Sequence, residues 1–170
     1  MVLAPASFKI SRSLAQALRN RDYEIRADSA FRAVMEACAA PRKGRRETWI
    51  VALMIDAYCA LHERGIAHSV ETWIDGELAG GLYGVALGRM FFGESMFTHA
   101  RDASKIALAH LVQHLAREGY ALIDCQMRTA HLASLGAHEM PRADFMRRVR
   151  DLVNYPQSTG HWTLARDAAF

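Results

Sequence analysis

The stretch HSVETWIDGELAGGLYGVALGRMFFG, residues 68–93, decides the fold of this chain. It contains three segments whose residues alternate or run apolar, as they do in β-strands: His68–Ile74, Glu77–Ala86 and Arg89–Gly93. Asp75-Gly76 and Leu87-Gly88 separate these segments, and short glycine-containing connections suit tight hairpins. The sequence therefore predicts an antiparallel meander of three strands.

Helical spacing dominates on both sides of this meander. Before it, we predict helices over Ser11–Leu18, from Ser29 through Cys38, and from Glu47 or Thr48 to about Gly65, with a short strand at Tyr23–Arg26. After it, we predict a helix from Asp102 or Ser104 to Glu118, a strand at Tyr120–Gln126, a helix from Pro141 or Arg142 to Val153, and a short strand around Trp162.

A strand–helix–strand step would place Tyr120–Gln126 parallel to the strand before it. The natural packing is an α/β (α+β) fold in which one mixed, mostly antiparallel sheet is covered by helices. This arrangement is compatible with a GNAT-type acyltransferase domain.

The composition favours one globular domain spanning residues 1–170, because 51% of the residues are hydrophobic and charges of both signs are spread along the chain. No apolar run is long enough to span a membrane, and Met1–Ile10 does not resemble a secretion signal, so we expect a cytoplasmic protein. Cys38, Cys59 and Cys125 stand in apolar stretches and read as reduced thiols. The net charge of +3 permits an anionic partner without requiring one.

Two polar residues interrupt the last apolar strand. Since side chains alternate along a strand, Asp124 and Gln126 are expected to point the same way, opposite to Ile123 and Cys125. A carboxylate and an amide near the carboxyl end of a buried strand form either a structural hydrogen-bond network or a functional site. The pattern by itself leaves both readings open.

Other polar residues give weaker signals. Glu94 follows an apolar strand just before a predicted turn and reads either as a site acid or as a solvated loop acid. Cys125 is expected to be inert because burial raises a thiol pKa. His110 and His114 lack the glutamate of a zinc protease motif and read as surface or rim histidines. No metal site is predicted.

A basic loop precedes an aromatic residue. Its Arg42, Lys43, Arg45 and Arg46 stand close to Trp49, and basic groups beside an exposed aromatic suit a nucleic-acid strand with a stacked base. The alternative reading is a solvated loop.

Several blocks together resemble a known family: GGLYGVA (80–86), FGESMF (92–97), ASK (103–105), LIDCQ (122–126) and HLASLGA (131–137). In this order and spacing, with ISRS (10–13) and TWI (48–50), they look like the bacterial leucyl/phenylalanyl-tRNA–protein transferases over essentially the whole chain. The resemblance implies a GNAT-like aminoacyltransferase that needs no metal and no coenzyme. It implies transfer of Leu, Phe or, less well, Met from charged tRNA to proteins beginning with Arg or Lys, which marks them for degradation by the N-end rule. No DNA or membrane partner is implied.

The resemblance also implies roles for individual residues. Asp124 and Gln126 match the family's catalytic pair, and Glu94 matches an acid at the same site. Trp49 matches a residue that contacts the terminal adenosine. The remaining matches are Leu82, Phe91 and Leu108 in the pocket for the amino-acid side chain, and Arg12 in tRNA binding, with Arg19 and the basic loop residues Arg42, Lys43, Arg45 and Arg46 expected to assist.

One departure from the family concerns the beginning of the chain. Family members normally begin with a further small domain, and Met1-Val2-Leu3 stands after it. A non-catalytic tRNA- or degron-binding remnant, or a piece active only beside that domain, is therefore an alternative. An acetyl-CoA-dependent N-acetyltransferase is a third reading, but Arg101–Lys105 lacks the glycines of a pyrophosphate loop.

The expected chemistry is aminolysis of an ester. An aminoacyl ester is already activated, so the enzyme has to position the amine and stabilise the developing charge. The hypothesis is that the carbonyl oxygen of Gln126 accepts a hydrogen bond from the amine. Asp124 would orient Gln126, and Glu94 would help to hold a cationic acceptor peptide.

Overall fold

Three long neighbouring strands form the centre of the sheet, as residues 68–93 predict: β3 (Ala67–Ile74), β4 (Glu77–Leu87) and β5 (Met90–Thr98). Asp75, Gly76 and Gly88 adopt positive φ angles in the two connecting turns, a conformation typical of tight hairpins. The structure, a computed structural model, describes residues 1–41, 48–156 and 159–164.

Three further strands complete a six-stranded sheet in the order β1-β6-β5-β4-β3-β2. β2 (Glu24–Ala27) pairs antiparallel with β3, and β1 (Val2–Leu3) pairs antiparallel with β6 (Leu122–Asp124). β6 and β5 form the one parallel pair among the described strands. The predicted parallel step and the mixed, mostly antiparallel sheet are thus confirmed.

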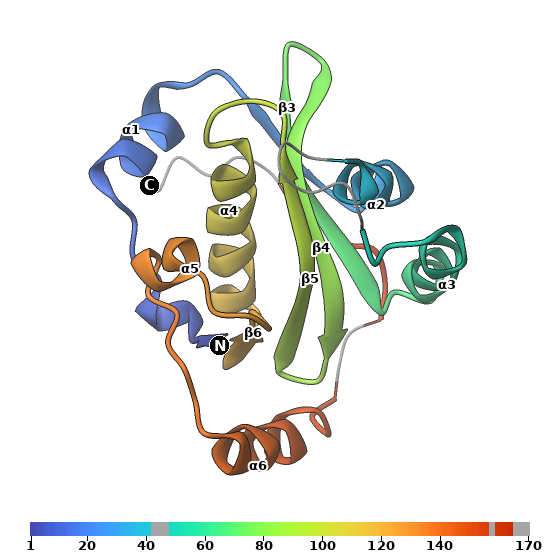
Figure 1. Cartoon of the computed structure of the whole chain (residues 1–170), viewed down its shortest axis with the longest axis vertical. Helices are drawn as coiled ribbons and strands as arrows, with labels where there is room; N and C mark the ends of the chain where they lie inside the picture. The colour runs from blue at the N-terminus through green and yellow to red at the C-terminus, as the bar shows by residue number, and fades with distance from the viewer. Residues whose placement is uncertain (42–47, 157–158, 165–170) are drawn as a thin grey trace.

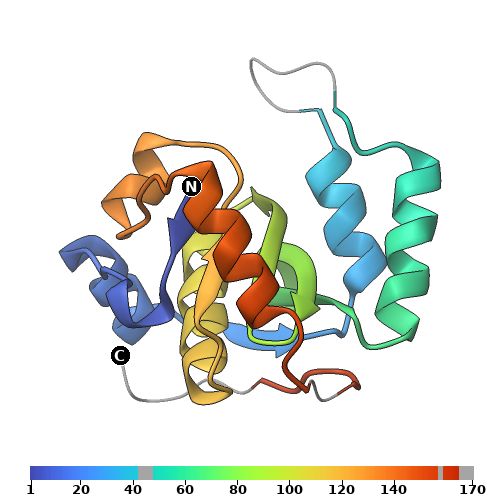
Figure 2. The ribbon, with the colours of Figure 1, turned by 90° about the horizontal axis from the view of Figure 1, so that it is seen from below.

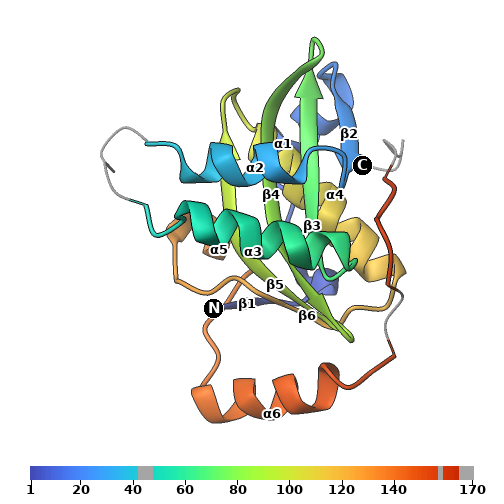
Figure 3. The same cartoon turned by 90° about the vertical axis from the view of Figure 1, so that its right-hand side faces the viewer.

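Helices cover both faces of the sheet (Figures 1 and 3). α4 (Ala103–Arg117) lies on one face, with α1 (Arg12–Asn20) and the short α5 (Ala130–Ser134) on the same side. α2 (Phe31–Ala39) and α3 (Ala52–Glu63) run side by side on the other face (Figure 2). α6 (Arg142–Leu152) packs at one end, and η1 (Pro5–Ser7) follows β1. None of the helices within the described ranges is both long and apolar enough to cross a membrane.

The two faces of the sheet bury separate apolar clusters because strand side chains alternate. On β3, Val70 joins the cluster beneath α4, whereas Ala67 joins the cluster beneath α2 and α3. A third, smaller cluster around Leu152 attaches α6 to β1, β5 and β6.

Several predicted boundaries are wrong. β5 continues to Thr98, past the predicted end at Gly93, and β6 stops at Asp124 instead of Gln126. α3 begins at Ala52 instead of Glu47 or Thr48, and Leu53, which helical spacing predicts on one apolar face with Met54 and Leu61, is 81% exposed. Residues 159–164 around Trp162 form no strand. β1 and α5 were not predicted, because short elements carry little periodic signal.

The buried Glu71 on β3 holds the beginning of α2. Its carboxylate accepts hydrogen bonds from the backbone N–H groups of Ser29 and Ala30, both at 3.2 Å, and from the Ser69 hydroxyl at 2.6 Å. The Ser29 hydroxyl donates to the same carboxylate. Because a helix N-terminus leaves N–H groups without intrahelical partners, this buried acceptor anchors α2 to the sheet.

The Glu71→Gln substitution tests this anchor. An amide would turn an NH2 group toward some of these donors, so we expect the free energy of unfolding to fall by about 1–3 kcal/mol. Urea denaturation measures the change. Glu77→Gln, at an exposed glutamate on β4, is the control and should change stability by less than about 0.5 kcal/mol. Equal effects of the two substitutions would refute the anchor.

Candidate functional site

The sheet opens where β5 loses its partner. Within β5, only Met90–Phe92 pair with β6, so from Gly93 onward β5 has no hydrogen-bonded neighbour on that side among the described strands. A pocket of about 340 Å³ occupies the opening. Its lining is mostly apolar and includes Leu82, Phe91, Met96, Leu108, Leu111, Ile123 and Leu132, with Glu94 and Asp124 among its polar residues.

Glu94 owes its position to a β-bulge. Tyr83 pairs with Ser95 and Gly84 pairs with Gly93, which leaves Glu94 as the extra residue of β5. Such bulges often redirect a side chain beside a functional site. Gly84 permits this bulge, since a Cβ atom there would lie 2.3 Å from the carbonyl oxygen of Phe92. Glu94 therefore lies within β5, and its predicted place after the strand and just before a turn is wrong.

Gln126 is held through both its backbone and its side chain. Its backbone N–H donates to Asp124 Oδ1 at 2.8 Å, and its Nε2 donates to Glu94 Oε2 at 2.9 Å. Because a carboxylate can only accept, the amide turns its NH2 group to Glu94 and keeps Oε1 as an acceptor. The structure therefore brings Asp124, Gln126 and Glu94 together, with Gln126 exposed and both acids half-buried.

This geometry differs from strand alternation. β6 has ended at Asp124, and Gln126 adopts a left-handed backbone conformation with φ of 56°. The Asp124 carboxylate reaches the backbone of Gln126 because the chain turns back after β6, and not because the two residues are one pleat apart. The carboxylate that contacts the Gln126 side chain is that of Glu94, whereas Asp124 contacts its backbone.

Tyr58 on α3 belongs to the same polar network, and the sequence did not single it out. Burial, followed by the charge of Glu94 and a hydrogen bond to it, raises the pKa of Tyr58 to about 12. The phenol is therefore protonated at neutral pH and lies near enough to Glu94 for the carboxylate charge to act on it. Only contacts between distant segments reveal this role, since Tyr58 fits an ordinary helical pattern.

The pocket walls suit an uncharged apolar group. Leu82, Phe91 and Leu108, expected in the amino-acid pocket, all line it. His131 lies at the same wall, and burial, assisted by the charge of Lys105, lowers its pKa. The imidazole therefore adds no positive charge at neutral pH.

The residues expected to contact tRNA lie elsewhere. Trp49 is 42% exposed and does not line the pocket. Arg12 and Arg19 are exposed on α1. Arg42, Lys43, Arg45 and Arg46 lie outside the described residues.

The expectation of surface or rim histidines is wrong for His110 and is not contradicted for His114. His110 is buried at 2% exposure, and its Nε2 lies 3.0 Å from the Tyr23 hydroxyl, so it belongs to the core and not to the rim. His114 is half-buried, and burial lowers its pKa. The i, i+4 spacing placed both residues correctly on one helix, but it could not show that this stretch of helix is covered.

Cys125 also lines the pocket, as do Ile123 and Asp124. Burial, and to a smaller extent the charge of Asp124, raises its pKa to about 11. This supports the expectation of an unreactive thiol, since the thiolate is the nucleophilic form.

Alkylation with iodoacetamide tests this pKa. In a Cys38→Ala/Cys59→Ala variant, Cys125 should react about 100-fold more slowly at pH 8 than a free cysteine, whose pKa is about 8.5. The rate should rise as the pH approaches 11. The same variant in urea provides the unfolded control. A rate at pH 8 that unfolding does not change would contradict the prediction.

A sequence model described as leucyl/phenylalanyl-tRNA protein transferase matches residues 2–150. Leucyl/phenylalanyl-tRNA–protein transferases of Nitrosomonas europaea and Nitrosospira multiformis are each 62% identical to this chain over 95% of its length, which covers 69% and 70% of those proteins. The corresponding enzyme of Chromobacterium violaceum is 60% identical over 95% of the chain and 70% of its own length.

Among solved structures, one similar chain is the C-terminal domain of a putative lysylphosphatidylglycerol synthetase from Agrobacterium fabrum. It has a TM-score of 0.49 and 13% sequence identity, over 99% of this chain and 59% of that chain.

Proposed function

Because the chain belongs to the leucyl/phenylalanyl-tRNA–protein transferase family, we propose that it moves leucyl, phenylalanyl or, less well, methionyl groups from tRNA to proteins beginning with Arg or Lys. Family membership establishes the general reaction, aminoacyl transfer from tRNA to a protein. It also disfavours the acetyl-CoA reading. The acceptors would then enter N-end rule degradation in the cytoplasm.

The pocket supports the choice of amino acid. Its apolar walls, which include Leu82, Phe91 and Leu108, enclose about 340 Å³, and no lysine or arginine among the lining residues supplies a compensating positive charge for an acidic side chain. Shape would then discriminate among apolar side chains, at about 1–3 kcal/mol per methylene.

The observation that carries the proposal is the side-chain amide of Gln126, which Glu94 holds beside this pocket while Asp124 accepts the backbone N–H of Gln126. Glu94 holds Nε2, so Oε1 can accept a hydrogen bond from an incoming α-amine. An α-amine has a pKa near 8, and only modest assistance is needed to present its lone pair at neutral pH. The amine nitrogen attacks the ester carbonyl, a C–N bond forms, the ester C–O bond breaks, and the amine proton passes to the departing ribose oxygen.

The two acids have different tasks in this mechanism. Glu94 polarises the Gln126 amide by accepting its N–H and is itself positioned by the Tyr58 hydroxyl. Asp124 holds the backbone of Gln126 in its left-handed conformation. Glu94 also places negative charge where a cationic acceptor residue would bind. The revised assignment keeps Asp124, Gln126 and Glu94 at the catalytic site but exchanges which acid orients the amide.

The donor would approach from the pocket rim. Trp49 offers an exposed ring on which the terminal adenosine can stack, and Arg12, Arg19 and the basic residues at 42–46 would contact phosphates. We treat residues 1–170 as one GNAT-like catalytic domain. A tRNA-binding remnant would instead bind charged tRNA without transferring its amino acid.

Transfer of labelled Phe from tRNA to an Arg-started peptide tests the site. Gln126→Ala should lower kcat/KM about 100-fold because the acceptor for the amine is lost. Asp124→Ala should lower it by about tenfold or more, since the turn is loosened. Gln113→Ala, which removes a half-buried amide on α4, serves as the matched control and should leave the rate within about twofold. Unchanged rates in both site variants would end this assignment.

Acceptor choice is tested with otherwise identical peptides. Peptides beginning with Arg or Lys should react at least about tenfold faster than those beginning with Ala, because a cation near Glu94 gains about 1 kcal/mol or more. Glu94→Gln should reduce this preference. Equal rates for the Arg, Lys and Ala peptides with the wild-type protein would remove the proposed acceptor specificity.

A further inference from the structure

The segment of residues 159–164 packs Trp162 into the core behind the pocket. The indole stacks on His68, with ring centres 3.9 Å apart and planes inclined by 3°. Its centre lies 5.9 Å from the ring of Phe91 and 4.6 Å from that of His114. Trp162 is therefore partly buried and packs against the apolar cluster beneath α4.

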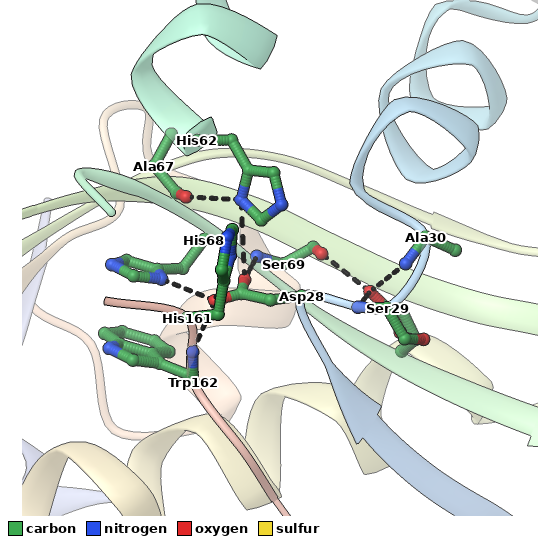
Figure 4. A network of polar contacts seen from close by, with 10 residues as sticks. Asp28, Ser29, Ala30, His62, Ala67, His68, Ser69, His161 and Trp162 are labelled. Carbon is green, nitrogen blue, oxygen red and sulfur yellow. Dashed lines mark hydrogen bonds and ion pairs between the residues drawn. The ribbon is translucent and has the colours of Figure 1, made fainter. Parts of the chain in front are cut away.

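Asp28 fastens this segment to the sheet (Figure 4). Its side chain is 1% exposed and accepts hydrogen bonds from the backbone N–H of Trp162 at 2.6 Å, from His68 Nδ1 at 2.8 Å and from the backbone N–H of Ser69 at 2.9 Å. One buried carboxylate thus joins the end of β2, strand β3 and the distant segment 159–164. Trp162 is therefore fixed in two ways: its backbone N–H bonds to Asp28, and its indole stacks on His68.

The same cluster brings His62 and His161 near Asp28, at a spacing that could hold a cation. His62 Nδ1, however, lies 2.9 Å from the carbonyl oxygen of Ala67 and must donate to it, because a carbonyl only accepts. Three donors already surround Asp28. The cluster is accordingly an anchor for the chain.

Phe91 connects this anchor to the pocket. Its ring is fully buried and forms part of the pocket wall. Gly84 lies directly against the ring, since a Cβ atom there would be 2.5 Å from Phe91 Cζ. The ring thus has Gly84, the indole of Trp162 and the pocket among its neighbours. How far the ring projects into the pocket depends on the indole behind it.

We propose that Trp162, anchored by Asp28, is a positioning residue that sets the size of the amino-acid pocket through Phe91. The inference rests on the proposed function, because it assigns selection of the aminoacyl side chain to that pocket. Without the indole, the Phe91 ring can retreat, the pocket enlarges, and phenylalanyl donors gain relative to leucyl donors.

Competition between Leu-tRNA and Phe-tRNA measures this effect. In Trp162→Ala, the ratio of kcat/KM for Phe to that for Leu should rise about tenfold, the range expected when a pocket gains space for about one methylene. Trp162→Phe retains a ring and should stay within about twofold of the wild type. Trp73→Phe, at a half-buried tryptophan on β3 remote from the pocket lining, is the matched control.

A merely structural role predicts another pattern, in which both donors lose activity equally and their ratio stays constant. That result in Trp162→Ala would overturn the proposal. If Trp162→Ala does not fold, Trp162→Leu and Asp28→Asn decide, since the first replaces the indole with a smaller apolar side chain and the second weakens the anchor. Both should raise the ratio, and an unchanged ratio in folded samples of both overturns it.

Binding of 3′-leucylamino- and 3′-phenylalanylamino-adenosine, which cannot transfer their amino acid, separates this inference from the proposed reaction. A shifted affinity ratio in Trp162→Ala supports the pocket mechanism even if the wild type fails to transfer, an outcome that would remove only the proposed function. Transfer by the wild type with unchanged ratios in every variant removes only the inference. Failure to bind either analogue and failure to transfer would remove both.

Discussion

The short parallel pairing between β5 and β6 is the constraint on which the site depends. Pairing ends at Phe92 and Asp124, yet β5 continues for several residues. Backbone groups that lose a strand neighbour must be served by solvent or by a ligand, so an opening is created without any loss of core packing. The bulge at Glu94 and the left-handed turn at Gln126 both occur at this point, and each directs a polar group toward the other.

Three carboxylates have different roles in this protein: two anchor distant segments, and one holds a side chain at the pocket. Asp28 and Glu71 are surrounded by backbone and side-chain donors in the interior, where they join segments far apart in sequence. Glu94 is half-buried and holds one side-chain amide at the pocket. A buried acceptor with all its donors present rigidifies the structure, whereas an accessible one can share its charge with a substrate.

The meander was predictable because the side chains of its strands alternate between two faces and glycine-containing turns separate the strands, a pattern that specifies the strand register. The parallel step to β6 was predictable from the intervening helix. The ends of the strands were not predictable, since β6 ends where its hydrogen-bonded pairing with β5 and β1 ends. Leu53 shows a similar limit: a helical face looks apolar in sequence whether or not another element covers it.

The sequence by itself determined the meander, the helices around it and, through the order of its motifs, the family. It also identified Asp124, Gln126 and Glu94 as polar groups out of pattern. Only the tertiary structure decided that Glu94, and not Asp124, holds the Gln126 side chain, that Tyr58 joins them, and that Trp162 stands behind Phe91. The physical reason is that periodicity records which face of an element a residue occupies, whereas hydrogen bonds and ring contacts depend on where a bulge, a turn or a distant segment brings that face.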